Sequence, residues 1–357
     1  MVVEQKKSQV LDLSRPGAVG VEIDVAEAAE VLMSLSAILD DDDDTFDLGR
    51  ERLAAARADI APRTAELIDA LAFRAEKCPA YLLGFVYELP SPRTFASLLD
   101  HLGAVDGLEI KLHLLGYHGS GHHLASPETI RRAAAGDQEA IEEYLAALAD
   151  YDVKQDVARR LLELEADAIK DGVLELLPRW YDEVFVPHSD GWREAAERDA
   201  EGKRKLAGAH TPEQLVELAT NGYQYSPDPG IRTLVFFPSW WMRPWVILWE
   251  HKSARIFCYP IRLEQEGDGV SAAELARLYK ALGDEGRLRL LRRLGEGPLR
   301  LSEAAAELGV AKSTAHHHLA ILRHAGLVTI RGEDENVYSL RRDTVPQAGA
   351  LLESFLG

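Results

Sequence analysis

Two short helical patterns separated by one glycine, near the C-terminal end of the chain, constrain the fold most. LSEAAAEL precedes Gly309, and KSTAHHHLAILRH follows it. In the second pattern Ala315, Leu319 and Leu322 recur at i, i+4 and i+7, so we expect them to face a hydrophobic core. A glycine between two helices permits a tight turn. The segment therefore predicts a helix-turn-helix.

The flanking residues complete the pattern of a winged helix. Upstream, Leu275, Leu278 and Leu282 form an apolar helical stripe, and Asp284 is expected to cap a second helix, RLRLLRRL. Downstream, LVTIR and VYSLRR are separated by GEDEN, which is typical of a β-hairpin. We therefore predict a winged helix-turn-helix over residues 271–357.

The outward side of the second helix carries polar groups that suit DNA. They cluster in its N-terminal half, the part of a recognition helix that contacts base edges in the major groove. A basic residue at the end of the first hairpin strand adds a contact from the wing. The expected DNA-binding residues are Lys312, Ser313, Thr314, His316, His317 and Arg331.

The successive segments KALGDEGRLRLLRRL, LSEAAAELGVAKSTAHHHLAILRHAGLV and VYSL together resemble the ArsR/SmtB winged-helix regulators. The resemblance covers only the C-terminal end of the chain. It implies a homodimer that binds two DNA half-sites, with recognition contacts at the helix positions just named. It also favours repression over activation.

Three features depart from the family pattern. The metal-sensing members carry Cys-x-Cys at the start of the helix before the turn, and the matching residues here are Arg300 and Ser302. A second family site takes Asp and His from the terminal helix, but PQAGALLESFLG has neither. We therefore expect no metal and no cofactor. The wing tip is usually basic, whereas here Glu333, Asp334 and Glu335 would be repelled by phosphate.

Most of the chain precedes the winged helix. We expect a flexible N-terminus over 1–20 and an α+β domain over 21–266, predominantly helical with a small antiparallel sheet. VEID is a strand candidate, and Ser91, Ser126 and Thr211, each followed by proline, are expected helix starts. RTLVFF, WVILWE and ARIFCYPI indicate an antiparallel meander, and LEQEGDGV indicates a linker.

Histidines cluster in one glycine-rich stretch of this domain, LHLLGYHGSGHHL. They form either a metal or ligand loop, or a surface loop without a ligand. Since no cysteine lies nearby, we favour the surface loop. The residues are His113, His118, His122 and His123.

Tryptophans cluster in the predicted sheet region. They line an effector pocket, or they form the core between the sheet and the helices, and both can be partly true. The candidate pocket residues are Trp240, Trp241, Trp245, Trp249 and Tyr259.

Composition limits the class of protein and its location. The net charge is −19, yet residues 271–357 hold 12 Lys and Arg against 11 Asp and Glu, so the acidic excess lies in the N-terminal domain. Cys78 and Cys258 are the only cysteines, which suits a reducing cytoplasm. No secretion signal and no apolar run of roughly 18 residues is present, so we expect a cytoplasmic protein without a membrane partner.

Taken together, these features favour a sequence-specific transcription regulator, an ArsR-type repressor controlled by a non-metal effector or partner that acts on the N-terminal domain. Its expected partners are double-stranded DNA, a second copy of the chain and a small-molecule effector. We expect no enzyme, because no G-x-S-x-G, P-loop, G-x-G-x-x-G or H-E-x-x-H pattern is found. Two alternatives stay open: an N-terminal enzyme or protein-interaction module, and a winged helix that serves mainly dimerisation.

Overall fold

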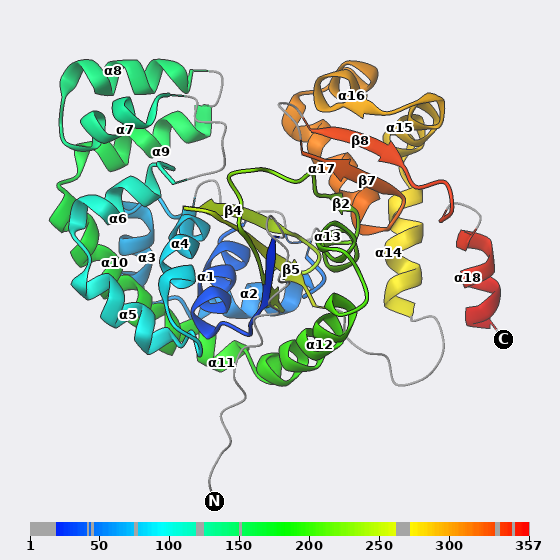
Figure 1. Cartoon of the computed structure of the whole chain (residues 1–357), viewed down its shortest axis with the longest axis horizontal. Coiled ribbons are helices and arrows are strands. Elements are labelled where there is room, and N and C mark those ends of the chain that lie inside the picture. Colours follow the sequence, from blue (N-terminus) through cyan, green and yellow to red (C-terminus); the bar gives the residue numbers. More distant parts are fainter. Residues whose placement is uncertain are drawn as a thin grey trace, which may run out of the picture. The chain divides into compact units, whose positions relative to one another are not determined.

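The computed structural model describes residues 19–40, 43, 46–74, 78–118, 125–149, 152–261, 272–332, 336–344 and 347–356 (Figure 1). The chain forms two compact units, each made of two stretches of sequence. The N-terminal unit comprises Met1–Arg204 and Gly230–Ile261, and the C-terminal unit comprises Lys205–Pro229 and Arg262–Gly357. No helix in the described residues has both the length and the apolar character that a membrane span requires. The expected linker, 264–269, lies outside the described residues.

A four-stranded mixed sheet forms the centre of the N-terminal unit. Its strands, in spatial order, are β1 (Gly20–Ile23), β3 (Thr233–Ser239), β5 (Ala254–Pro260) and β4 (Ile247–His251). The predicted antiparallel meander is wrong for most of this sheet, because β1, β3 and β5 are parallel and only β4 runs antiparallel to its neighbour. The two most apolar strands, β3 and β5, are buried along almost their whole length. They therefore lie side by side in the middle, and the half-buried β4 forms an edge.

Helices make up most of the rest of this unit, in agreement with the predicted class. They are α1 (Glu27–Ile38), α2 (Arg50–Ala58), α3 (Pro62–Ala70), α4 (Leu83–Glu88), α5 (Phe95–Ala104), α6 (Gly107–Leu114), α7 (Pro127–Ala134), α8 (Gln138–Ala147), α9 (Asp152–Glu163), α10 (Ala166–Trp180), α11 (Val186–His188) and α12 (Trp192–Ala207). Ser126 caps α7 as predicted. No helix begins at Ser91, whose hydroxyl lies 3.3 Å from a carboxylate oxygen of Asp24, and α5 is capped by Thr94 instead.

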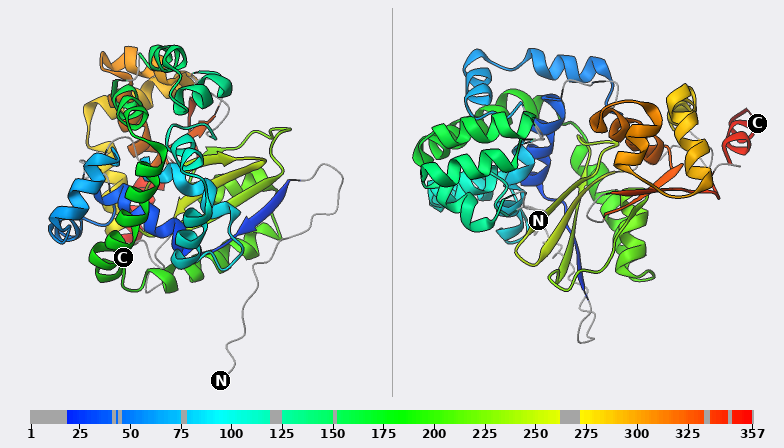
Figure 2. Two further views of the ribbon diagram at one scale, coloured as in Figure 1. Left: turned by 90° about the vertical axis from the view of Figure 1, so that its left-hand side faces the viewer. Right: turned by 90° about the horizontal axis from the view of Figure 1, so that it is seen from above.

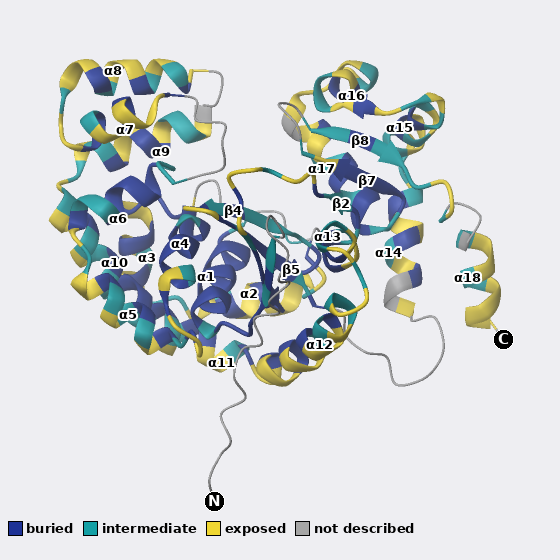
Figure 3. Ribbon diagram, viewed as in Figure 1, coloured by how far each residue is buried: buried dark blue, intermediate teal, exposed yellow. Residues whose placement is uncertain are grey.

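Two helices cover opposite faces of the sheet (Figure 2). Cys258 and Tyr259 are neighbours on β5, so their side chains point to opposite faces. Glu30 of α1 interacts electrostatically with Cys258. On the other face, the Lys203 ammonium of α12 lies 5.5 Å from the centre of the Tyr259 ring. Helix α1 is buried at every residue after its first, which makes it the centre of the core (Figure 3).

The C-terminal unit contains the predicted winged helix. Its elements are α14 (Ala272–Leu282), α15 (Glu285–Glu296), β6 (Leu299–Arg300), α16 (Leu301–Leu308), α17 (Lys312–His324), β7 (Val328–Arg331), β8 (Val337–Leu340) and α18 (Gln347–Leu356). Asp284 caps α15, and Gly309 ends α16 with a φ of 71°, a left-handed value that favours glycine. Ala315, Leu319 and Leu322 are fully buried, which confirms the predicted core face of α17.

The C-terminal unit begins earlier in the chain than the predicted boundary at residues 266–271. It includes α13 (Pro212–Thr220), which Thr211 opens with the expected capping arrangement, and β2 (Tyr223–Gln224). Strand β2 pairs in parallel with β7, which gives a second sheet of order β2-β7-β8-β6. The boundary therefore differs from the prediction because 205–229 pair with residues far downstream in sequence.

Candidate functional site

The aromatic residues of the predicted effector pocket belong to the core of the N-terminal unit. Trp245 is half-buried. The other four are buried: Trp240, Trp241, Trp249 and Tyr259. Trp249 stacks on Tyr81 with ring centres 4.7 Å apart, and the Trp241 indole N–H donates to the Ser189 hydroxyl at 2.9 Å. These contacts agree with the alternative that the cluster forms the sheet core, and the pocket stays a prediction.

Glu30 of α1 holds the turn that follows β3. One carboxylate oxygen accepts the backbone N–H groups of Trp240 and Trp241 at 2.8 and 2.9 Å. The side chain is almost fully buried, and this burial raises the pKa of Glu30 to about 7. Sequence reasoning missed this residue because it lies near the start of an otherwise apolar helical pattern, EAAEVLMSL, where a second glutamate gives no signal.

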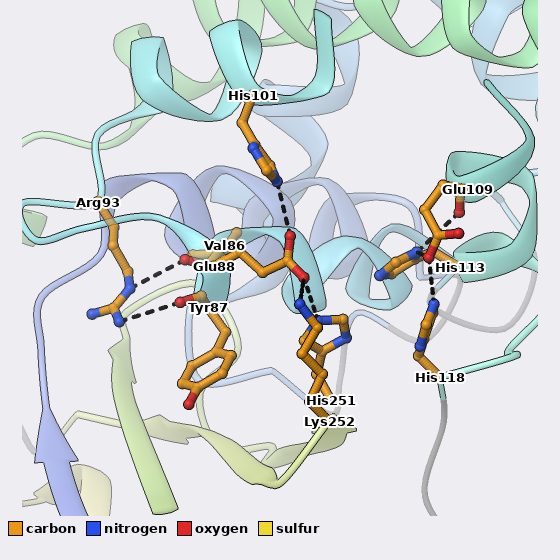
Figure 4. A network of polar contacts seen from close by, with 10 residues as sticks. All are labelled: Val86, Tyr87, Glu88, Arg93, His101, Glu109, His113, His118, His251 and Lys252. Carbon is orange, nitrogen blue, oxygen red and sulfur yellow. Dashed lines mark hydrogen bonds and ion pairs between the residues drawn. The ribbon is translucent and has the colours of Figure 1, made fainter. Parts of the chain in front are cut away.

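The first histidine of the stretch LHLLGYHGSGHHL does not lie in a surface loop, which was the preferred prediction. His113 lies in the last turn of α6 and is 1% exposed. His118 follows it closely, with ring centres 4.2 Å apart, and its Nε2 lies 2.7 Å from a carboxylate oxygen of Glu109 (Figure 4). The interpretation is therefore wrong for His113, because the apolar face of α6 carries the imidazole inward. His122 and His123 lie outside the described residues.

A third histidine, His251 at the end of β4, joins this group from a distant part of the sequence. Its ring centre lies 5.3 Å from that of His113 and 5.1 Å from that of His118. Its Nε2 lies 2.8 Å from a carboxylate oxygen of Glu88, which also accepts from Lys252 (Figure 4). Burial alone would raise the pKa of Glu88, but hydrogen bonds from Lys252 and His251 lower it to about 2.

The hydrogen bonds determine which nitrogen of each buried ring carries the proton. His113 Nδ1 lies 2.9 Å from the Glu109 carbonyl oxygen, which can only accept, so Nδ1 is protonated and Nε2 keeps its lone pair. In His251 the carboxylate of Glu88 likewise requires the proton on Nε2 and leaves the lone pair on Nδ1. Burial lowers the pKa of both rings, that of His113 to about 3, so both are neutral at pH 7.

Gly84 of α4 leaves room for these two lone pairs. A Cβ atom at this position would lie 2.7 Å from His251 Nδ1 and 2.9 Å from His113 Nε2. Both nitrogens are buried and have no hydrogen-bond partner in the part of the chain that the structure describes. Two buried acceptors therefore face the same small space. The sequence grouped His113 with His118, and the i, i+4 spacing of Glu109 and His113 was a further signal that sequence reasoning could have used. Gly84 and His251 gave no such signal.

The predicted DNA-binding side of α17 is exposed as expected. Lys312, Thr314 and His316 are exposed, and His317 is half-buried. Ser313 lies in the same first turn, and its side chain is outside the description. His318 lies against the start of α15, with Nδ1 3.6 Å from a carboxylate oxygen of Asp284. The polar groups at the N-terminal half of α17 thus form one surface, supported from behind by α15.

The predicted hairpin of the wing is present in β7 and β8, which pair antiparallel from Val328 with Leu340 to Arg331 with Val337. Arg331 is exposed at the end of β7. The acidic tip, residues 333–335, lies outside the described residues. At the first family metal position, Arg300 is exposed, and its backbone N–H donates to the Glu303 carboxylate at 2.7 Å. The side chains of Arg300 and Ser302 are poor ligands for a metal ion.

Comparison with known proteins agrees with this geometry. The family model described as "Bacterial regulatory protein, arsR family" matches residues 284–329, from the cap of α15 into β7. These residues include the helix-turn-helix and none of the N-terminal unit.

Several bacterial regulators are similar to the chain. The uncharacterised HTH-type transcriptional regulator YceK of Bacillus subtilis is 40% identical over 72 residues, which cover 19% of this chain and 72% of YceK. The HTH-type transcriptional regulator NmtR of Mycobacterium tuberculosis is 37% identical over 81 residues, 22% of this chain and 68% of NmtR. A transcriptional repressor SmtB homologue of Synechocystis is 39% identical over 67 residues, 19% of this chain and 51% of the homologue. The chain therefore belongs to the ArsR family of bacterial regulatory proteins, through the winged helix of its C-terminal unit.

Proposed function

We propose that the protein regulates transcription by binding duplex DNA with α17 in the major groove. The observation that carries this proposal is the division of α17 into a buried apolar face and an exposed polar N-terminal half, which includes Lys312, Thr314 and His316. The named relatives are transcriptional regulators, and one of them is a repressor. In this proposal Ser313 and His317 add contacts from the same helix, and Arg331 adds one from the wing.

The proposed DNA-binding form is a homodimer on a pseudo-palindromic site. Apolar side chains of the first and last helices of the winged helix support a second copy as the partner: Tyr279 of α14 is 40% exposed, and Phe355 and Leu356 of α18 are 45% and 75% exposed. The Tyr279 hydroxyl lies 3.3 Å from the Ala348 carbonyl oxygen, so the two helices form one surface. Packing this surface against the same surface of a second copy would remove these apolar side chains from water, which is favourable.

The input to the regulator is proposed to enter through the N-terminal unit and to lower operator affinity, so that the protein acts as a repressor. The chain passes between the two units three times, at residues 204–205, 229–230 and 261–262. The segment 205–229 is bonded to the C-terminal end of α17 through Asn221, whose side chain donates to the His324 carbonyl at 3.1 Å. A displacement of this segment would tilt α17. In a dimer this would change the spacing or tilt of the two α17 helices relative to the two DNA half-sites.

In this proposal the N-terminal unit binds its effector or partner and does not convert it. A screen of metabolites against the purified protein separates the alternatives, since an enzyme gives turnover and a sensor gives only saturable binding.

DNA binding itself is tested by the salt dependence of affinity for the protein's own upstream region and for an unrelated duplex of equal length. The expected result is higher affinity for the upstream region, with log K falling linearly against log salt concentration for both. A winged helix that serves only dimerisation would show weak binding, no preference and little dependence on salt.

A further inference from the structure

The histidine cluster of the N-terminal unit has the composition of a metal site. One ligand atom from each of Glu109, His113 and His118 lies within 4.8 Å of the other two. Imidazole nitrogens with a carboxylate oxygen suit zinc and its first-row neighbours. Ligand atoms around a tetrahedral Zn²⁺ lie ~3.4 Å apart, given bond lengths of about 2.1 Å. The three ligand atoms must therefore move closer together when an ion binds.

Two buried nitrogens point to a ligand independently of this spacing. His113 Nε2 and His251 Nδ1 carry lone pairs, are buried, and have no hydrogen-bond partner among the described residues. Each lies within 3 Å of the position that a Cβ atom would take on Gly84, so they converge on one point of α4. A buried acceptor without a partner is unfavourable, and a metal ion would supply the partner for both.

The hydrogen bonds that hold the rings of His113 and His251 are of the kind found around histidines that bind metal ions. A ligating histidine normally donates its other ring N–H to a carboxylate or a backbone carbonyl. His113 donates to the Glu109 carbonyl oxygen at 2.9 Å, and His251 donates to the Glu88 carboxylate at 2.8 Å. Both rings are therefore held with the free nitrogen directed into the cluster.

We propose that Glu109, His113 and His118 bind one divalent transition-metal ion of the zinc class. His251, which lies outside the group within 4.8 Å, becomes the fourth ligand when its ring shifts towards the ion. The ion replaces the proton in the hydrogen bond between His118 Nε2 and the Glu109 carboxylate oxygen, which lie 2.7 Å apart. It links the C-terminal end of α6 to the end of β4. The side chains of Glu109 and His118 are 38% and 19% exposed, so the ion enters from solvent on their side. This site lies in the N-terminal unit and does not depend on DNA binding.

The test uses the full-length protein without a histidine tag, stripped of metal with a chelator and then dialysed. Zn²⁺ is titrated against a chromophoric competitor, and Co²⁺ serves as a second probe because its visible absorption reports the ligand geometry. The variants are His118→Gln and Glu109→Gln, which are partly exposed and are expected to fold. The control is His188→Gln, because His188 forms a similar pair with Asp59 in the same unit, at 2.7 Å, outside the cluster.

The expected result is one equivalent of Zn²⁺ bound by the wild type and by His188→Gln. Both cluster variants should bind at least about tenfold more weakly, with far-UV circular dichroism unchanged. The proposal is overturned if the wild type binds no Zn²⁺ at micromolar concentration, or if the folded cluster variants bind it as tightly as the control. In either case the cluster is a set of hydrogen-bonded core histidines.

Discussion

Arg323 of α17 donates a hydrogen bond from Nη1 to the carbonyl oxygen of Thr220, 2.8 Å away and 103 residues earlier in the chain. The guanidinium is almost fully buried, and burial lowers the pKa of Arg323 to about 10, so it remains charged at pH 7. Helix α17 and the segment 205–229 are thus joined by a charged hydrogen bond shielded from water. Such bonds contribute about 1.5–3 kcal/mol each.

Replacing Arg323 tests whether this bond fastens the segment to the winged helix. Arg323→Ala should destabilise the C-terminal unit by about 2–4 kcal/mol, because it removes the donor and leaves a cavity. Arg323→Met should cost less, since it fills the space without a buried charge. Hydrogen exchange at the Ile330 amide, which donates to the Gly222 carbonyl at 2.8 Å, measures the effect where β2 meets β7. Unchanged protection in Arg323→Ala would contradict this role.

Gly84 gives a second prediction, on packing around the histidine cluster. In Gly84→Ala the new Cβ would lie closer than 3.0 Å to nitrogens of His113 and His251, so both buried rings must shift. We expect a loss of about 1–3 kcal/mol in the free energy of unfolding, measured by urea denaturation. The matched control is Gly103→Ala in α5, where a Cβ meets nothing within 4 Å, so the change should be neutral or stabilising. Equal effects of the two substitutions would refute the close approach.

The raised pKa of Glu30 leads to a prediction of how the stability of the protein depends on pH. Its pKa is about 7 in the folded protein, above the value of 4.5 expected when unfolded. Folding therefore favours the protonated acid, and the associated stability is full below pH 4.5 and is lost as the pH rises through 7. The shift corresponds to about 3 kcal/mol.

The matched variant for this prediction is Glu30→Gln, which keeps an oxygen to accept the two backbone N–H groups. The gain in unfolding free energy between pH 8 and pH 5, measured by urea denaturation, should be larger in the wild type than in the variant. The nearby groups Arg243 and Cys258 keep their charge states between pH 5 and pH 8 and are present in both proteins. The same pH dependence in both would show that Glu30 does not titrate in this range.

The proposed dimer is tested by changing the end of α18. Phe355→Glu with Leu356→Glu should shift the protein to a monomer in sedimentation-velocity experiments, because four carboxylates would face one another across a symmetric interface. Operator affinity should fall with it, since two half-sites are no longer bound together. The control is Val153→Glu on α9, an apolar side chain 51% exposed in the N-terminal unit, which should leave the dimer intact. Dimers in both proteins would place the interface elsewhere.

The winged helix could be predicted from sequence because its signals are local. Asp284 as a cap, Gly309 as a turn, and the spacing of Ala315, Leu319 and Leu322 all act within a few residues of one another. Each of these signals determines where one helix begins, ends or faces the core. Together they predict the order and packing of the helices.

The parts that sequence reasoning missed depend on contacts between distant residues. The apolar patterns identified β3, β4 and β5, but periodicity does not reveal that β5 lies between β3 and β4. The pairing of β2 with β7 gave no signal in a two-residue strand. In the histidine cluster, His113 and His118 are neighbours in sequence, whereas His251 joins them only through the fold.

DNA binding through α17 is tested by comparing two variants of equal net charge for binding to the protein's own upstream DNA. Lys312→Glu with His316→Ala alters the exposed surface of α17, and Arg198→Glu makes the same change of charge on an exposed residue of α12 in the N-terminal unit. We expect the first variant to bind about tenfold or more weakly, with a smaller salt slope, and the second to bind like the wild type. Equal affinity of both variants for the upstream region would contradict DNA binding through α17.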